Sequence, residues 1–145
     1  ALICGEERST YSNFNSRVNQ LAHALLRLGL TKGDKVAVLF YNSIPFVEVY
    51  FAAIKAGGVI VPVNFRFVGE EAAYILNHSD SRFFFFGEEF HGFVQSIRPT
   101  LPRVEFFVAT GRVVRLGGRV AVVHMELVND AEEQIATGSA AYIIG

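Results

Sequence analysis

The sequence predicts an α/β fold, with a largely parallel sheet and flanking helices. Strand-like and helix-like segments alternate at short spacing between residues 14 and 109, which favours parallel strands joined by right-handed crossovers. Residues 35–41 and 82–86 form nearly continuous apolar runs, which are typical of strands covered on both faces. Residues 52–66 combine a helix end, a Gly57-Gly58 stop and a β-branched strand that leads into a polar loop.

The composition indicates one domain with a sizeable core. The chain has 145 residues, of which 51% are hydrophobic and 19% charged, and these values argue against disorder. The net charge of −1 gives no electrostatic reason to expect nucleic acid or an anionic membrane surface as a partner. No apolar run approaches the roughly 18–20 residues that span a bilayer, so we expect no transmembrane segment. The single cysteine, Cys4, agrees with a reducing compartment, and we expect a cytoplasmic protein.

The start of the chain predicts a small hairpin followed by a long amphipathic helix. Residues 1–11 can pair as a hairpin around Gly5. Thr10 or Ser12 can then cap a helix, and Gly29 ends it. The helix buries one face, because its apolar residues are spaced at intervals of four and three: Phe14, Val18, Leu21, Leu25 and Leu28.

A buried strand and a buried helix are predicted next. Residues 35–41 form the strand, and Ser43 with Pro45 marks the start of the helix. The helix runs to the glycine pair and is apolar nearly all round, apart from Glu48 and Lys55. We therefore expect its surface to be largely buried.

The following strand, at residues 59–63, is expected at an edge of the sheet. Pro62 has no N–H to donate to a neighbouring strand, and such residues are confined to edges and strand ends. Beyond it the sequence predicts, in order, a helix at 70–77, a strand at 82–86, a helix at 88–97, a strand at 104–109, a hairpin at 112–125, a short helix or loop at 126–134 and a strand at 140–144.

Catalytic and metal-binding patterns are missing from the sequence. It has no glycine-rich phosphate-binding motif, and its four histidines do not have metal-ligand spacing. Cys4 lies in an expected strand without a local activating group and is interpreted as a buried, inert thiol. No pair of acid and base residues can be argued. We therefore predict neither a catalytic residue nor a metal ligand within these 145 residues.

Two polar loops follow strands and are therefore expected at the carboxyl-terminal edge of the sheet. They are residues 41–43, with Asn42, and residues 64–66, with Asn64 and Arg66. Ligands of open α/β sheets bind at this edge. The planar guanidinium of Arg66 suits a phosphate or a carboxylate. The alternative is a surface arginine that pairs with a glutamate in the next helix, Glu70 or Glu71.

Several segments, in the same order and at similar spacing, resemble the adenylate-forming (AMP-binding) superfamily. This superfamily includes acyl-CoA synthetases, the adenylation domains of peptide synthetases and firefly luciferase. The resemblance is close over about residues 1–86 and looser beyond. It is carried by TYSNFN (10–15), RVNQLA (17–22), GLTKGDKVAV (29–38), NSIPF (42–46), KAGGVIVPVN (55–64) and EEAAYILNHS (70–79). Gly69 departs from the usual Thr, Ser or Pro, so we expect a weaker start to the helix that follows.

The stretch PVNFRF at 62–67 resembles the Pro-Leu-Asn-x-Arg-Leu pattern of acyl- and aryl-CoA ligases, whereas peptide-synthetase domains carry Asp at the position of Asn64. The resemblance implies that a fatty or aryl acid reacts with ATP and Mg²⁺ to give an acyl-adenylate, from which the thiol of CoA displaces AMP. It also implies that Arg66 lies near the nucleotide phosphates of CoA. Arg66, Asn64 and Asn42 are the candidate contacts with substrate or CoA.

The resemblance further implies that residues 1–145 are the N-terminal α/β subdomain of an AMP-dependent ligase, ending just before the phosphate loop. The strand at 140–144 resembles the one that this loop follows. We therefore expect the fragment alone to be inactive, to bind no cofactor and to self-associate through uncovered apolar faces. The alternative is a stand-alone, flavodoxin-like binding or interaction module without catalysis.

Overall fold

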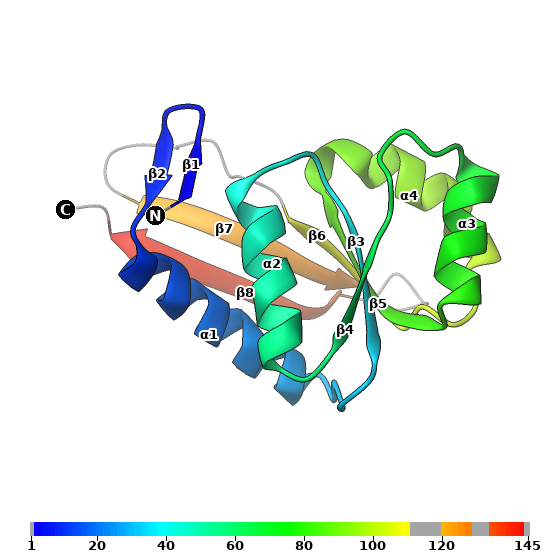
Figure 1. Ribbon diagram of the computed structural model, residues 1–145, viewed down its shortest axis with the longest axis horizontal. Helices are drawn as coiled ribbons and strands as arrows, with labels where there is room; N and C mark the ends of the chain where they lie inside the picture. The colour runs from blue at the N-terminus through cyan, green and yellow to red at the C-terminus, as the bar shows by residue number, and fades with distance from the viewer. Residues whose placement is uncertain (1, 111–119, 129–133, 144–145) are drawn as a thin grey trace.

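The computed structural model describes residues 2–110, 120–128 and 134–143, with side chains for residues 2–110. A two-stranded antiparallel ribbon pairs β1 (Leu2–Cys4) with β2 (Glu7–Ser9), as the predicted hairpin requires. The main sheet has six strands in the order β4-β3-β5-β6-β7-β8 (Figure 1). Their bounds are β3 Lys35–Leu39, β4 Val59–Pro62, β5 Ser81–Gly87, β6 Phe106–Thr110, β7 Val120–Val128 and β8 Gln134–Ile143.

The predicted α/β fold with a largely parallel sheet is confirmed. The strands β4, β3, β5 and β6 are parallel to one another, whereas β7 and β8 each run antiparallel to the strand before them. The final predicted strand is also confirmed within β8. β4 lies at one end of the strand order with Pro62 as its last residue, so the predicted edge strand is confirmed too.

One part of the C-terminal prediction is wrong. The start of the predicted loop or helix at 126–134 belongs to β7, which continues to Val128 and pairs with β8. A lone acidic residue between Met125 and Leu127 does not end a strand, because alternate positions stay apolar. The first strand and turn of the predicted hairpin at 112–125, and residues 129–133, lie outside the described residues.

Four helices cover the parallel part of the sheet. α1 (Tyr11–Arg27) and α2 (Ile44–Lys55) lie on one face, and α3 (Gly69–His78) and α4 (His91–Ile97) lie on the other (Figure 1). Short 3₁₀ turns, η1 (Glu88–Phe90) and η2 (Arg98–Thr100), flank α4. The chain therefore has two cores, one on each side of the sheet.

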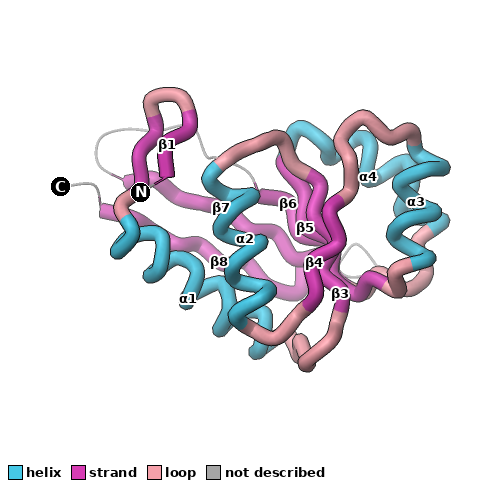
Figure 2. Tube along the Cα trace, viewed as in Figure 1, coloured by secondary structure: helices cyan, strands magenta, loops and turns pink. Residues whose placement is uncertain are grey.

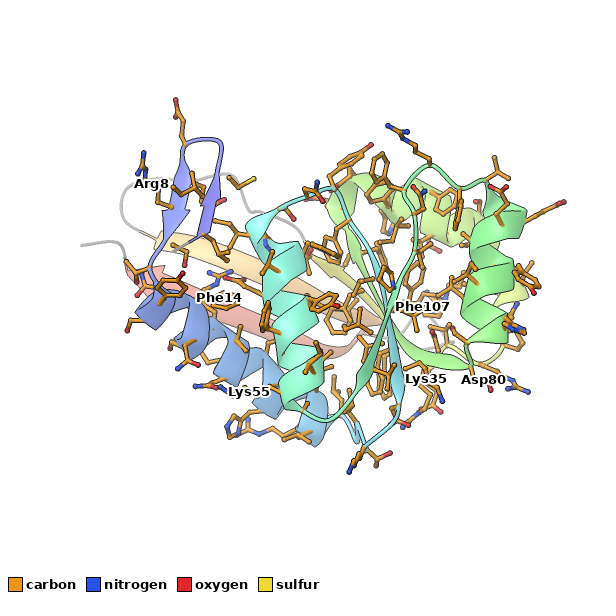
Figure 3. The ribbon with its side chains drawn as sticks, viewed as in Figure 1. Arg8, Phe14, Lys35, Lys55, Asp80 and Phe107 are labelled. Carbon is orange, nitrogen blue, oxygen red and sulfur yellow. The ribbon has the colours of Figure 1, made fainter. Side chains whose placement is uncertain are left out.

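The phenylalanine run of β5 fills both cores, because successive side chains of a strand point to opposite faces. Phe83 and Phe85 pack with α1 and α2, whereas Phe84 and Phe86 pack with α3 and α4. All four are buried, as the continuous apolar run predicts. Phe107 of β6 joins the second core and is labelled between the sheet and those helices in Figure 3.

The helix boundaries follow from local hydrogen bonds. Thr10, rather than Ser12, caps α1, because its Oγ1 accepts the N–H of Asn13 at 3.2 Å. Ser43 caps α2 in the same way, accepting the N–H of Phe46 at 3.3 Å. Both predicted starts are therefore confirmed to within a residue or two.

The glycine pair between α2 and β4 is used in two different ways. Gly57 has a φ of +93°, which only glycine adopts readily. At Gly58 a Cβ would lie 3.1 Å from the Ala53 carbonyl oxygen, so the chain has little space for a side chain there. The pair thus stops the helix and lets β4 start close against it.

The weak helix start that Gly69 predicts has a structural reason. A Cβ at Gly69 would lie 2.9 Å from Cγ2 of Ile97 in α4, so glycine allows the two helices to approach each other. Glu71 compensates at the helix start, because its Oε2 accepts the N–H of Val68 at 3.0 Å.

The predicted burial of α2 is wrong in detail. Phe51 and Ile54 are 49% and 50% exposed, whereas Glu48 is only 5% exposed. The Glu48 Oε1 lies 2.5 Å from the Nε of Arg17 in α1, so the buried carboxylate is paired across the two helices. A buried charge is tolerated when it is paired, and the partner on another helix was not evident from the local pattern.

Candidate ligand-binding site at the carboxyl ends of the strands

The loops that follow β3, β4 and β5 lie together at one edge of the sheet, because parallel strands end on the same side. They are at the top of the view in Figure 2, where the loops are pink. The connection between β3 and α2 contains Asn42, and the one between β4 and α3 contains Asn64 and Arg66. The structure therefore brings the two predicted loops to the same edge.

Three aromatic rings join these loops. The Tyr41 ring centroid lies 5.0 Å from that of Phe65 and 4.9 Å from that of Phe90, so it contacts the β4–α3 loop on one side and η1 on the other. Phe90 is 8% exposed and belongs to the core under α3 and α4, whereas Tyr41 and Phe65 are 51% and 43% exposed. The rings thus form a half-exposed shelf anchored in the core.

The Asn64 side chain shapes the loop that carries Arg66. Its Oδ1 accepts the backbone N–H of Arg66 at 3.0 Å, and its backbone oxygen accepts the N–H of Phe67 at 3.0 Å. This is an Asx-type turn, in which an asparagine side chain replaces a backbone acceptor. The structure thus gives Asn64 a loop-forming contact, and its role toward a ligand stays a prediction.

The guanidinium of Arg66 is exposed and faces the shelf. Its Cζ lies 5.6 Å from the Phe65 ring centroid, which is within the range of a cation–π contact. The alternative prediction, a pair with Glu70 or Glu71, is not seen: no ion pair of Arg66 occurs among residues 2–110. Glu71 instead accepts the N–H of Val68. Arg66 therefore has hydrogen-bond donors to offer to an anion.

Asn42 is exposed at the same edge, and its backbone oxygen accepts the Cys4 thiol at 3.7 Å. Cys4 is also exposed, so the prediction of a buried thiol is wrong. The reason is that the β1–β2 ribbon is two-stranded and projects from the fold, leaving no layer to cover that position (Figure 1). The role of Asn42 as a ligand contact stays a prediction.

The described residues contain neither a metal-binding cluster nor a membrane-spanning helix. Within these residues, no group of three or more His, Cys, Asp or Glu side chains is arranged to hold a metal ion. His23, His78 and His91 are exposed, and the side chain of His124 lies outside the described residues. None of the described helices combines the length and the hydropathy needed to cross a bilayer. The predicted compartment is not tested by this finding.

The opposite edge of the sheet holds an ion cluster around Arg82. The Arg82 guanidinium lies 2.7 Å from Asp34 Oδ2 and 2.7 Å from Glu105 Oε2, and it also donates to the Gly29 carbonyl at 3.4 Å. The pKa of Asp34 is lowered because its carboxylate accepts hydrogen bonds from the backbone N–H and the hydroxyl of Thr31. The neighbouring Arg82 guanidinium lowers it further. The bond to Glu105 raises the pKa of Arg82. Both terminal nitrogens of Arg82 are therefore held by acceptors of the fold, whereas its buried Nε has no hydrogen-bond partner among the described residues. The cluster is structural.

A shallow hollow lies on α3 beside the Arg66 loop. It encloses about 380 Å³ and is lined by Phe67, Glu70, Glu71, Tyr74 and Ile75. Two carboxylates without a basic residue in the lining disfavour an anionic ligand there. The candidate anion site is therefore the Arg66 face of the shelf rather than this hollow.

The shelf itself was not predicted. Periodicity and motif position predicted the two loops. They did not predict that the Tyr41 ring contacts those of Phe65 and Phe90, because this contact depends on the order of the strands. The available signal was an aromatic residue shortly after each of three successive strands.

Comparison with known proteins places these features in a family. Over 105 residues the chain is 37% identical to a medium/long-chain-fatty-acid–CoA/3-oxocholest-4-en-26-oate–CoA ligase of Mycobacterium marinum, covering 72% of the chain and 19% of the relative. Over 83 residues it is 45% identical to 4-hydroxybutyrate–CoA ligase 2 of Metallosphaera sedula. This match covers 57% of the chain and 15% of that relative. The chain therefore spans less than a fifth of the length of these two relatives.

A solved structure agrees in fold. The anthranilate CoA ligase AuaEII, in complex with anthranoyl-AMP, superposes with a TM-score of 0.74 at 30% identity, covering 81% of this chain and 23% of that one. The sequence profile of one family, described as AMP-binding enzyme, matches residues 1–141. The parallel sheet, its covering helices and the matched sequence together show that the chain belongs to the AMP-binding enzyme family.

Proposed function

We propose that these residues form the N-terminal part of an ATP-dependent carboxylate–CoA ligase that activates a fatty or aryl acid. The observation that carries the proposal is that the relatives described above, at 37% and 45% identity, are CoA ligases. In the proposed reaction the acid carboxylate attacks the α-phosphate of ATP and releases pyrophosphate. The CoA thiol then attacks the acyl carbon of the adenylate and releases AMP.

In this proposal the Arg66 edge holds the phosphate-bearing end of CoA. An exposed guanidinium without a described ion pair fits a phosphate, because it can donate two parallel hydrogen bonds. Asn64 supports Arg66 through its turn, and Asn42 lies on the neighbouring loop. We assign no catalytic step to these residues. Their proposed role is to bind and orient the co-substrate.

The described residues do not supply a site for Mg²⁺, because no suitable ligand group occurs among them. Nor do they contain a glycine-rich phosphate loop between residues 2 and 110. We therefore derive no step through the metal from this chain. We also propose that the 145-residue chain on its own does not form the adenylate.

The experiment is acid-dependent exchange of pyrophosphate into ATP, followed by thioester formation with CoA, for the complete protein that carries this chain. A panel of fatty and aryl acids identifies the substrate. We expect exchange with at least one acid, and no exchange by the 145-residue chain tested in parallel. A folded complete protein that exchanges with no acid would contradict the ligase proposal, and full activity of the short chain would contradict its inactivity.

A second candidate is a flavodoxin-like binding module. The parallel strands are ordered β4-β3-β5-β6, which corresponds to the 2-1-3-4 order of flavodoxin-like sheets. This module would bind its ligand between the carboxyl ends of β3 and β5 and would catalyse nothing. It predicts that the 145-residue chain alone binds a ligand as tightly as the complete protein does, whereas the ligase proposal predicts much weaker binding.

We also propose that the 145-residue chain self-associates. β8 is ten residues long and ends the strand order, so one of its backbone edges has no partner strand among the described residues. Unpaired edges and exposed apolar side chains, such as Phe51 and Ile54, promote association. Light scattering over a range of concentrations should show oligomers, and a monomer throughout that range would contradict the proposal.

A further inference from the structure

A continuous row of ring contacts connects the core to Arg66. Phe90 is buried, its ring lies 4.9 Å from that of Tyr41, and the Tyr41 ring lies 5.0 Å from that of Phe65. The Arg66 guanidinium carbon then lies 5.6 Å from the Phe65 ring. The row thus runs from a core residue, Phe90, through two half-exposed rings to a charged group in solvent.

The loop that carries Arg66 has few other supports. Its last bond to the sheet is from the Val63 N–H to the Val38 carbonyl, at 2.9 Å. Beyond that point the Asn64 oxygens accept from Arg66 and Phe67 within the same loop. These local bonds set the shape of the turn, and Phe67 at its end packs against the second core. The tip between Val63 and Phe67 is attached to the sheet by the contact between Phe65 and Tyr41.

We infer that Tyr41 is a positioning residue, which fixes the Arg66 loop to the core through its two ring contacts. Tyr41 is suited to this because it follows β3, the strand between β4 and β5, and so reaches the loops on both sides. The consequence for binding rests on the proposed function: a loose loop would present Arg66 less often in the position that meets a phosphate of CoA.

A simpler alternative is that Tyr41 and Phe65 only shield each other from water. In that case removing the Tyr41 ring would lower stability a little but would not change the loop beyond it. The two interpretations therefore differ in the behaviour of the amides of Arg66 and Phe67. Both amides donate to Asn64, so their exchange with solvent reports on the turn.

The first test is hydrogen–deuterium exchange of the complete protein as wild type, Tyr41→Leu and Tyr41→Phe. We expect Tyr41→Leu to accelerate exchange of the Arg66 and Phe67 amides about two- to tenfold, the range that corresponds to loss of one aromatic pair. Tyr41→Phe keeps the ring and should behave as wild type. Tyr11→Leu is the matched control, because Tyr11 is a 78% exposed tyrosine at the start of α1, which covers the other face of the sheet. Unchanged exchange in a folded Tyr41→Leu protein would overturn the inference.

The second test is kinetic and uses a double-mutant cycle. We expect Tyr41→Leu to raise the KM for CoA about two- to tenfold and to change pyrophosphate exchange less than this, because the first step does not use CoA. In the double variant that also carries Arg66→Ala, the KM for CoA should rise less than the two single substitutions together predict, since Tyr41 acts through Arg66. Additive effects would contradict this route. If the wild type forms no thioester at all, the proposed function fails. The hydrogen–deuterium exchange experiment would still decide the role of Tyr41.

Discussion

The two edges of the parallel sheet each carry an arginine, and the two arginines differ in their surroundings. At the amino-terminal edge Arg82 is bound by Asp34, Glu105 and the Gly29 carbonyl. Figure 3 labels Lys35, at the start of β3, and Asp80, just before β5, on this edge. At the carboxyl-terminal edge Arg66 faces an aromatic ring and has no ion pair among the described residues.

This difference separates an arginine that holds the fold from one that is available for a ligand. The two terminal nitrogens of Arg82 are bound by carboxylates and its Nε is buried, so an incoming anion would have to displace Asp34 or Glu105. The donors of Arg66 can be used without breaking any described ion pair. The cation–π contact with Phe65 orients the planar guanidinium. Its N–H groups, which point outward in that plane, stay available to an anion.

The largest effect on stability should come from Arg82→Ala. It leaves Asp34 and Glu105 without their common partner, and we expect the free energy of unfolding to fall by about 1–3 kcal/mol. Urea denaturation measures this change. Arg103→Ala is the matched control, because it removes an exposed pair with Asp80 and should cost less than about 1 kcal/mol. Equal losses in the two variants would contradict the structural role of Arg82.

Asp34→Asn should have a smaller effect that depends on pH. The pKa of Asp34 is lowered in the folded state, so its charge stabilises the fold above the ordinary carboxyl pKa of about 4. That contribution is lost as the pH falls through the lowered value. We therefore expect the variant to be about 1 kcal/mol less stable than wild type at pH 7.

The same comparison at low pH tests the sign of this effect. The difference in unfolding free energy between wild type and Asp34→Asn should shrink progressively below about pH 4. Asp80→Asn is the control, since its partner Arg103 is exposed. A difference that stays constant from pH 7 down to pH 3 would mean that the Asp34 charge does not stabilise the fold.

Arg66→Ala should have the smallest effect on stability. Its guanidinium is exposed and makes no described ion pair, so the free energy of unfolding should change by less than about 0.5 kcal/mol. A loss above about 1 kcal/mol would place Arg66 among the structural residues together with Arg82, and the contrast between the two edges would disappear.

The sequence was a good guide to the fold where the pattern is local. Apolar periodicity located α1, and the continuous runs located β3 and the buried phenylalanines of β5. It failed where a partner comes from elsewhere in the chain. Glu48 is buried because Arg17 lies on the neighbouring helix, and β7 runs past its acidic residue because β8 pairs with it.

The candidate site shows the same limit. A strand followed by a polar loop was enough to predict that Arg66 lies at the carboxyl-terminal edge of the sheet. The pairing of Arg66 with Glu70 or Glu71 could not be decided from spacing, since it depends on Glu71 turning back to the Val68 N–H. The ring contacts of Tyr41 required the strand order β4-β3-β5, which no local pattern contains.

The most direct test of the central claim compares two thiol acceptors, CoA and pantetheine, in the complete protein, which we propose to be a CoA ligase. Pantetheine keeps the thiol arm of CoA but lacks its phosphates. We predict that Arg66→Ala lowers kcat/KM for CoA about tenfold or more, the loss expected for a charge-assisted hydrogen bond. The same variant should leave kcat/KM for pantetheine unchanged, and Arg103→Ala should leave both unchanged. An equal loss with both acceptors, or no loss with CoA, would contradict the assignment of Arg66 to the phosphates.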